Sequence, residues 1–115
     1  MTQKEIAEAF SNGDFEKTFP YFSDNIQWIV IGENNFTGRD EVIKNCIQTA
    51  DYFKTLTTHF KTLNVISGQN RIAVNGTAEF LKDNKRVAFV SACDVYEFDN
   101  DSRLEKITSY CIQEK

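Results

Sequence analysis

The chain has 115 residues, of which 41% are hydrophobic and 26% charged, and its formal net charge is −4. This apolar content is enough to form a core and excludes a disordered chain, while no apolar run approaches the roughly 18 residues of a membrane-spanning helix. The acidic balance is the opposite of what binding to a DNA or RNA backbone requires, so nucleic acid and anionic membranes are not expected as partners.

A first helix is predicted to begin at the capping box Thr2-x-x-Glu5 and to end at the Asn-Gly pair at 12–13. Asp14 is placed to cap a second, short helix. Pro20 must interrupt that helix, because proline lacks the N–H group of the helical ladder. The N-terminal segment also lacks the apolar stretch of a signal peptide.

Residues 26–31 are rich in β-branched and aromatic side chains and predict a strand that ends at Gly32, followed by a short turn at 33–35. Thr37-x-x-Asp40 is expected to open a third helix. Its apolar residues recur at helical spacing, which predicts the following buried face: Val42, Ile43, Cys46, Ile47, Ala50 and Phe53.

After about residue 55 the chain reads as long strands in consecutive hairpins, at 55–67, 71–82, 86–98 and 103–113. Helices followed by an antiparallel meander make an α+β fold, in a single domain that spans residues 1–115. Strands of roughly 11–13 residues exceed the usual five or six and must curl. A strongly curved sheet with helices on one face encloses a cavity.

Both faces of these strands carry apolar side chains. On the strand at 86–98, the odd-numbered positions place Val87, Phe89, Cys93 and Val95 on one face, and the even-numbered positions place Ala88, Val90, Ala92 and Phe98 on the other. Three short helices cannot cover both faces of the sheet. We therefore expect the second face to meet another copy of the chain in a homodimer.

The cysteines and the histidine limit the expected metal and redox chemistry. Cys46, Cys93 and Cys111 are an odd number of cysteines and have no C-x-x-C spacing, so a disulfide framework is not expected and a reducing cytoplasm fits best. With a single histidine in the chain, a tetrahedral zinc site is not expected either. No cofactor is implied.

Several motifs occur in the order in which a nuclear transport factor 2-like domain has them. The segments N-G-D-F at 12–15, S-D-N-I-Q-W at 23–28 and F-T-G-R-D-E-V-I at 36–43 resemble the opening of that domain. C-D-V-Y-E-F-D at 93–99 and R-L-E-K-I at 103–107 resemble its closing hairpin. The chain is most similar to the SnoaL-like branch, home of polyketide cyclases and relatives of ketosteroid isomerase.

This resemblance covers roughly residues 3–113 and implies a cone-shaped, curved antiparallel sheet with three N-terminal helices around a pocket. Such a fold is a cystatin-like α+β roll, usually dimeric through the outer face of the sheet. It hosts isomerases, cyclases, dehydratases and non-catalytic domains, so the chemistry has to be argued from individual residues.

Asp94 is the first candidate catalytic residue. Ketosteroid isomerases use an aspartate base, a tyrosine and a protonated aspartic acid; the resemblance puts the first two positions on Val30 and Ile6, which cannot move a proton, and the third on Asp94. Mid-strand burial would favour the protonated form and make Asp94 an acid or hydrogen-bond donor near neutral pH. Alternatively, Asp94 hydrogen-bonds a neighbouring strand or Tyr96 and only shapes the cavity.

His59 is the second candidate, as a base or donor, because the resemblance points the strand face it shares with Thr57 and Lys61 inward. The alternative is a solvent-facing edge. The same question arises for Glu79, which shares a face with Asn75 and Thr77. The resemblance points that face into the pocket, whereas burial of the apolar set on the same strand argues the reverse.

If its face is internal, Glu79 would form an acid/base pair with His59 or Asp94; otherwise it faces water or a dimer rim. Trp28 is the expected platform for a ligand. A Cys-His nucleophile is not expected. The full predicted pocket comprises Trp28, Val30, Phe15, Phe19, Asn75, Thr77, Glu79, Val90, Ala92, Ile107, Ser109 and Cys111.

Two functions remain open on the sequence. One is cofactor-free acid/base catalysis, such as isomerisation, cyclisation or dehydration, on a small and largely apolar molecule. The other is a non-catalytic ligand-binding or dimerisation module that has kept the fold.

Overall fold

A computed structural model describes residues 1–114 of the chain. Its helices are α1 (Gln3–Ser11), the 3₁₀ helix η1 (Phe15–Tyr21) and α2 (Arg39–Phe53). Its strands are β1 (Phe22–Val30), β2 (Asn34–Thr37), β3 (Thr57–Gly68), β4 (Arg71–Lys82), β5 (Lys85–Phe98) and β6 (Leu104–Gln113). The predicted α+β order, with helices mostly before long strands, is confirmed.

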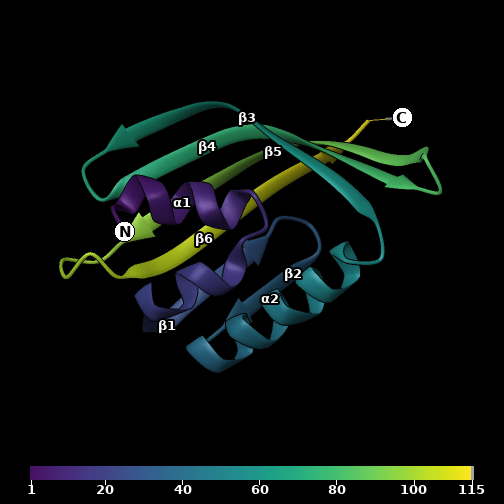
Figure 1. Cartoon of the computed structure of the whole chain (residues 1–115). Helices are drawn as coiled ribbons and strands as arrows, with labels where there is room; N and C mark the ends of the chain where they lie inside the picture. The colour runs from purple at the N-terminus through teal and green to yellow at the C-terminus, as the bar shows by residue number, and fades with distance from the viewer. Residues whose placement is uncertain (115) are drawn as a thin grey trace.

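The strands form one curved, unclosed sheet in the order β2-β1-β6-β5-β4-β3. Neighbouring strands are antiparallel except β1 and β6, which pair in parallel. The helices lie together on one side of this sheet, with α1 across the long strands and α2 beside β1 and β2 (Figure 1). The parallel pair and the short strand β2 were not predicted.

The capping box of α1 is confirmed, because the Thr2 hydroxyl accepts from the Glu5 N–H at 3.1 Å and Glu5 Oε1 accepts from the Thr2 N–H at 2.8 Å. Of the other two predicted caps, Asp14 occupies the N-cap position of η1, but Thr37 is not the N-cap of α2. Asp14 makes no capping hydrogen bond, and the short helix that follows it is 3₁₀ and contains Pro20. The N-cap of α2 is Gly38, because Thr37 is still paired with β1 as the last residue of β2.

The buried face of α2 is narrower than its apolar pattern predicts. Val42 and Cys46 are fully buried, but Ile47 is 49% exposed. The helix contacts β1, β2 and η1 rather than the middle of the sheet. Only part of its surface therefore meets protein, and the rest faces solvent or the space between the helix and the strands.

A glycine allows β3 to approach β4 at the point where the sheet bends. A Cβ atom added at Gly76 would lie 2.6 Å from the carbonyl oxygen of Lys61. The register of β3 shifts immediately beside this point, between Thr62 and Asn64. A bulge of this kind bends its strand and increases the local twist, which helps the sheet to curve around the helices.

The outer face of the sheet carries an apolar row that crosses five strands. Cross-strand register aligns Ile66, Ala73, Val95, Thr108 and Ile29. Tyr110 and Ile112 are further exposed apolar residues on this face. No helix within residues 1–114 is long and apolar enough to cross a membrane.

Candidate functional site

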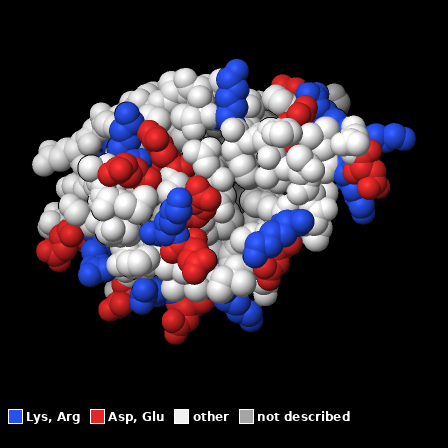
Figure 2. Space-filling view, in the orientation of Figure 1, with Lys and Arg blue, Asp and Glu red and all other residues white. Residues whose placement is uncertain are grey.

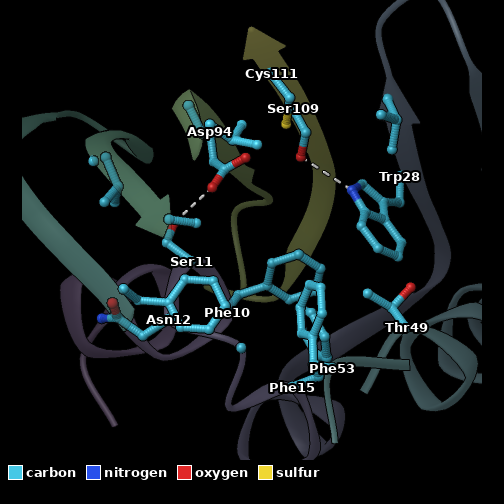
Figure 3. A pocket seen from close by; sticks show the side chains of 18 of the residues that line it. Phe10, Ser11, Asn12, Phe15, Trp28, Thr49, Phe53, Asp94, Ser109 and Cys111 are labelled. Atoms are coloured by element: carbon cyan, nitrogen blue, oxygen red, sulfur yellow. Dashed lines mark hydrogen bonds between the residues drawn. The ribbon is translucent and has the colours of Figure 1, made fainter. Parts of the chain in front are cut away.

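A cavity of about 450 Å³ lies between the inner face of the sheet and the helices (Figure 3). This volume is in the range of pockets that bind small molecules. Aromatic rings pack against one another around it; for example, the ring of Phe10 meets Trp28 edge-on at 5.2 Å between centroids. Its apolar wall is formed by Phe10, Phe15, Trp28, Val30, Phe36, Phe53, Phe60, Val74, Ala78, Phe80, Val90 and Ala92.

Asp94 is a carboxyl group in this apolar wall. It projects from β5 and is half-buried. Ser11, in the last turn of α1, donates a hydrogen bond of 2.9 Å from Oγ to Asp94 Oδ2. The same Oγ lies 2.5 Å from the hydroxyl oxygen of Tyr96. Because Ser11 has one hydroxyl proton and gives it to Asp94, Tyr96 is the donor in the second bond.

A second chain of hydrogen bonds reaches Asp94 from the other side. The indole Nε1 of Trp28 donates to Ser109 Oγ at 3.1 Å. An indole N–H can only donate, so Ser109 accepts and keeps its own proton free. Ser109 faces Asp94 across the β5–β6 register and hydrogen-bonds its carboxyl. The donors therefore converge on one carboxyl.

Burial raises the pKa of Asp94 above its ordinary value. The hydroxyl groups of Ser109, Ser11 and Tyr96 beside the carboxyl act in the opposite direction and do not outweigh burial. Burial raises the pKa of Cys111 to about 11, with smaller contributions from the negative charges of Asp94 and Glu33. Cys111 thus lines the cavity as a neutral thiol, which is a poor nucleophile at neutral pH.

The structure brings most of the predicted pocket residues to the cavity. The residues that line it are Asp94, Trp28, Val30, Phe15, Thr77, Val90, Ala92, Ser109 and Cys111. Phe19 and Ile107 do not line it. Phe19 packs against the core beside Phe22, and Ile107 is fully buried within the core, where it pairs with Trp28 on β1.

The predicted placement of Asn75 and Glu79 in the pocket is corrected by the structure. The alternate set on β4, which includes Val74 and Phe80, faces the cavity instead, because these apolar side chains gain more from leaving water. Asn75 accordingly bonds to Asn64 of β3 at 2.8 Å. Glu79 forms an ion pair with Arg86, and Arg86 Nε donates a hydrogen bond of 2.8 Å to Glu79 Oε2.

His59 also lies on the outward face. It is exposed, and it pairs in register with Glu79, while its neighbour Phe60 lines the cavity. His59 therefore does not reach Asp94 or the thiol of Cys111. The predicted base is not in the cavity, and a Cys-His pair is not formed.

The model of the SnoaL-like domain family matches residues 4–109. The chain belongs to this SnoaL-like family. Its fold also matches an NTF2-like protein of unknown function from Cytophaga hutchinsonii, at 36% identity and a TM-score of 0.86 over 95% of each chain. No curated protein matches the chain.

Two more distant structures share the SnoaL-like fold. One is an LEH-like epoxide hydrolase of M. tuberculosis, at 16% identity and a TM-score of 0.70 over 94% of this chain and 80% of that one. The other is SalBIII, an epoxide hydrolase/cyclase-like enzyme of pyran ring formation in salinomycin, at 21% identity and a TM-score of 0.72 over 96% and 90%. At these identities the likeness shows the fold alone.

The predicted pocket of this SnoaL-like site lacked much of its apolar wall, including Phe10, Phe53 and Phe60, and it also lacked two polar parts. One is Ser11, whose bonding partners lie far away in the chain. The other is the polar set Asn45, Gln48 and Thr49, which lines the cavity from α2 and was visible as polar residues at positions i, i+3 and i+4. Within residues 1–114, no three His, Cys, Asp or Glu side chains gather as metal ligands.

Proposed function

We propose that this SnoaL-like protein binds a small, largely apolar molecule in its cavity and that Asp94 acts on it as a general acid. The observation that carries the proposal is a carboxyl group with a raised pKa in an otherwise apolar wall. Such a group keeps its proton closer to neutral pH than an ordinary carboxyl does. An oxygen of the bound molecule can receive that proton without a cofactor.

A single carboxyl group is sufficient for dehydration or isomerisation. In a dehydration, Asp94 gives its proton to a leaving hydroxyl as the C–O bond breaks. The resulting carboxylate then removes a proton from the adjacent carbon as the C=C bond forms, so water leaves and the acid is restored. The use of one carboxyl group as both acid and base fits this cavity, because the other lining carboxylate, Glu33, is exposed to solvent.

The named neighbours support acid chemistry on an oxygen atom. One is named as an epoxide hydrolase and the other as an epoxide hydrolase/cyclase-like enzyme. Both reactions named there open or form a C–O bond. We extend this to the present chain only as the class of chemistry that Asp94 would serve, with isomerisation, cyclisation and dehydration as the expected reactions.

A non-catalytic binding module is the second candidate. Val30 stands in the cavity wall and Ile6 in the core, at the two positions where the resemblance to ketosteroid isomerases would need a base and a tyrosine. In this reading the apolar wall holds the ligand, and Asp94 only donates a hydrogen bond to it.

We also propose that the chain forms a homodimer through the outer face of the sheet. The apolar row through Val95 is flanked on one side by a charged row of Arg71, Glu97 and Lys106, while the ion pair of Glu79 and Arg86 lies farther along the same face, beyond Asn75 and Thr77. An apolar centre with a charged rim is typical of protein interfaces. Because both charge signs occur in each rim, a second copy can meet this face without net repulsion.

The test starts from a native mass spectrum of the untagged protein as purified, which reports any retained small molecule. Turnover of that molecule is then compared in wild type, D94N and E79Q. The second variant makes the same carboxyl-to-amide change outside the cavity. We expect D94N to lose about 100-fold or more of the turnover and E79Q to lose none.

Full turnover by D94N would rule out the acid role. Binding without any turnover in wild type would favour the binding module. If the purified protein carries no extra mass, NMR titration with 2-acetylnaphthalene replaces the retained molecule as the test of binding, and failure to bind it would count against an apolar-ligand pocket.

A further inference from the structure

The cavity-facing side of α2 is polar where it should be apolar. Asn45, Gln48 and Thr49 all line the cavity, and their spacing places them on one helical face, one turn before Phe53. A helix that only closes an apolar cavity would present apolar side chains on this face. Packing against the cavity therefore does not explain why these three residues are polar.

These side chains have hydrogen-bonding capacity left over. Asn45 Nδ2 donates to the Glu41 carbonyl at 2.9 Å, and Thr49 Oγ1 donates to the Asn45 carbonyl at 2.8 Å, both within the helix. The Asn45 amide oxygen and the Thr49 hydroxyl oxygen remain free to accept. Gln48 is exposed, and its side-chain amide makes no hydrogen bond to another group of residues 1–114.

This polar set lies across the cavity from Asp94. Figure 3 shows Asp94 and Ser11 on one side and Thr49 on the other, with Trp28 beside Thr49 and the rings of Phe10 and Phe53 in the middle of the view. Asn34, at the start of β2, also lines the cavity. The cavity therefore has two polar ends separated by an aromatic middle.

The charges around the cavity exclude an anionic ligand. Two lining residues are acidic, Asp94 and Glu33. Lys61 also borders the cavity, but it alternates with the cavity-lining Phe60 along β3, which groups its side chain with that of His59 on the outward face. On the face that carries the helices, acidic and basic side chains are interspersed without a continuous basic patch (Figure 2). A carboxylate or phosphate on the ligand would thus find no cationic partner.

We infer that the cavity takes an uncharged molecule with a ring-containing apolar body and an oxygen function at each end. One oxygen accepts a hydrogen bond from Asp94. The other, a hydroxyl group, is bound by Gln48, Asn45 and Thr49 at the α2 end of the cavity, here called the mouth because Gln48 is exposed there. A hydroxyl suits this end because it can both donate to the free oxygens and accept from the Gln48 amide. This inference rests on the proposed function and names its substrate class.

Three rigid probes test the inference by isothermal titration calorimetry at neutral pH. 2-Acetylnaphthalene carries only the oxygen for Asp94, 6-acetyl-2-naphthol adds a hydroxyl at the far end, and 6-acetyl-2-naphthoic acid replaces it with a carboxylate. We expect the naphthol to bind about 3- to 10-fold more tightly than 2-acetylnaphthalene, the effect of about one net hydrogen bond. The naphthoate is expected to bind at least about 10-fold more weakly than the naphthol.

Gln48→Leu is the variant that isolates the mouth, and Gln69→Leu makes the same change in an exposed turn away from the cavity. We expect Q48L to remove most of the preference for the naphthol over 2-acetylnaphthalene. Q69L should keep the preference. Because Gln48 is exposed, its replacement does not disturb the core.

The outcomes distinguish a failure of this inference from a failure of the proposed function of Asp94. Equal binding of 2-acetylnaphthalene and the naphthol, or tighter binding of the naphthoate, overturns the inference and leaves the acid role of Asp94 standing. A preference that survives in Q48L overturns the role of the mouth residues. Failure of all three probes to bind would contradict the apolar-ligand pocket itself.

Discussion

Ser11 and Asp94 are separated by 83 residues in the chain and are joined by a hydrogen bond of 2.9 Å. The bond ties the last turn of α1 to the middle of β5, and therefore the helices to the sheet. Tyr96, on the same face of β5, donates to the same serine. The Asp94 carboxyl is held in one orientation at the cavity wall, as a group that acts on a bound molecule has to be.

Asp94→Asn should remove the contribution of this carboxyl group to the pH dependence of the free energy of unfolding. Folding raises the pKa of Asp94, so the native state holds a proton that the unfolded chain releases above its ordinary pKa of about 4. The associated stability is fully present below that pH and is lost as the pH rises through the folded-state pKa. The free energy of unfolding of wild type should fall over this interval relative to that of D94N.

Urea unfolding of wild type, D94N and E79Q at a series of pH values from about 3 to 8 measures this difference. E79Q is the control, because Glu79 lies on the outer face. Parallel pH profiles for wild type and D94N would show that the carboxyl is not perturbed by folding.

Ser109→Ala should destabilise the protein by about 1–3 kcal/mol, because the buried indole N–H of Trp28 loses its acceptor. Urea unfolding followed by the fluorescence of the single tryptophan measures the change. Ser67→Ala, in an exposed part of β3, should change the stability by less than about 0.5 kcal/mol. Equal effects of the two variants would mean that the Trp28–Ser109 bond contributes nothing to stability.

Gly76→Ala should cost about 1–3 kcal/mol of stability, since its methyl group would meet the Lys61 carbonyl oxygen at 2.6 Å. Gly68→Ala, also in a strand, places its methyl group 3.9 Å from the nearest backbone atom. That variant should be neutral or more stable by up to about 1 kcal/mol. Thermal or urea unfolding of the pair measures the contrast, and a stable G76A would mean that β3 and β4 need not approach so closely.

Ile66→Glu should convert the proposed dimer to a monomer, because it places a charge in the apolar row of the outer face. Ile66 is 62% exposed in the single chain, so the variant should still fold. Ile47→Glu is the matched control, with an isoleucine 49% exposed on α2. Light scattering after size-exclusion chromatography measures the mass of each, and a monomeric wild type would exclude the dimer.

The parts of the fold that local patterns specify could be predicted. The capping box at Thr2 marks the start of α1. The turns at 69–70 and 83–84 and the long apolar runs give both ends of β3, β4, β5 and β6 within about two residues of those observed. The parallel pairing of β1 with β6 could not, because it joins segments about eighty residues apart and no local pattern records it. Strand β2 was missed because its four residues include Asn34 and Asn35, which rarely favour strands.

The site, too, could be predicted only in part. Strand alternation shows that His59 shares a face with Thr57 and Lys61, and Glu79 with Asn75 and Thr77, but it does not say which face of the sheet points inward. The resemblance predicted that this face points inward. In the structure, Val74 and Phe80 on the opposite face of β4 line the cavity instead. The resemblance placed Asp94 at the site, but the bond of Asp94 to Ser11 depends on how α1 docks, which no spacing in the sequence encodes.

The sheet order places β6, which follows all the other strands in the chain, between β1 and β5. During synthesis on the ribosome, the hairpin of β1 and β2 and the meander of β3 to β5 therefore have no strand to join them until residues 104–113 emerge. Trp28 also waits for its acceptor, Ser109, over that time. The nascent chain thus exposes both halves of its apolar wall, and the cavity is complete only when the last strand has inserted between them.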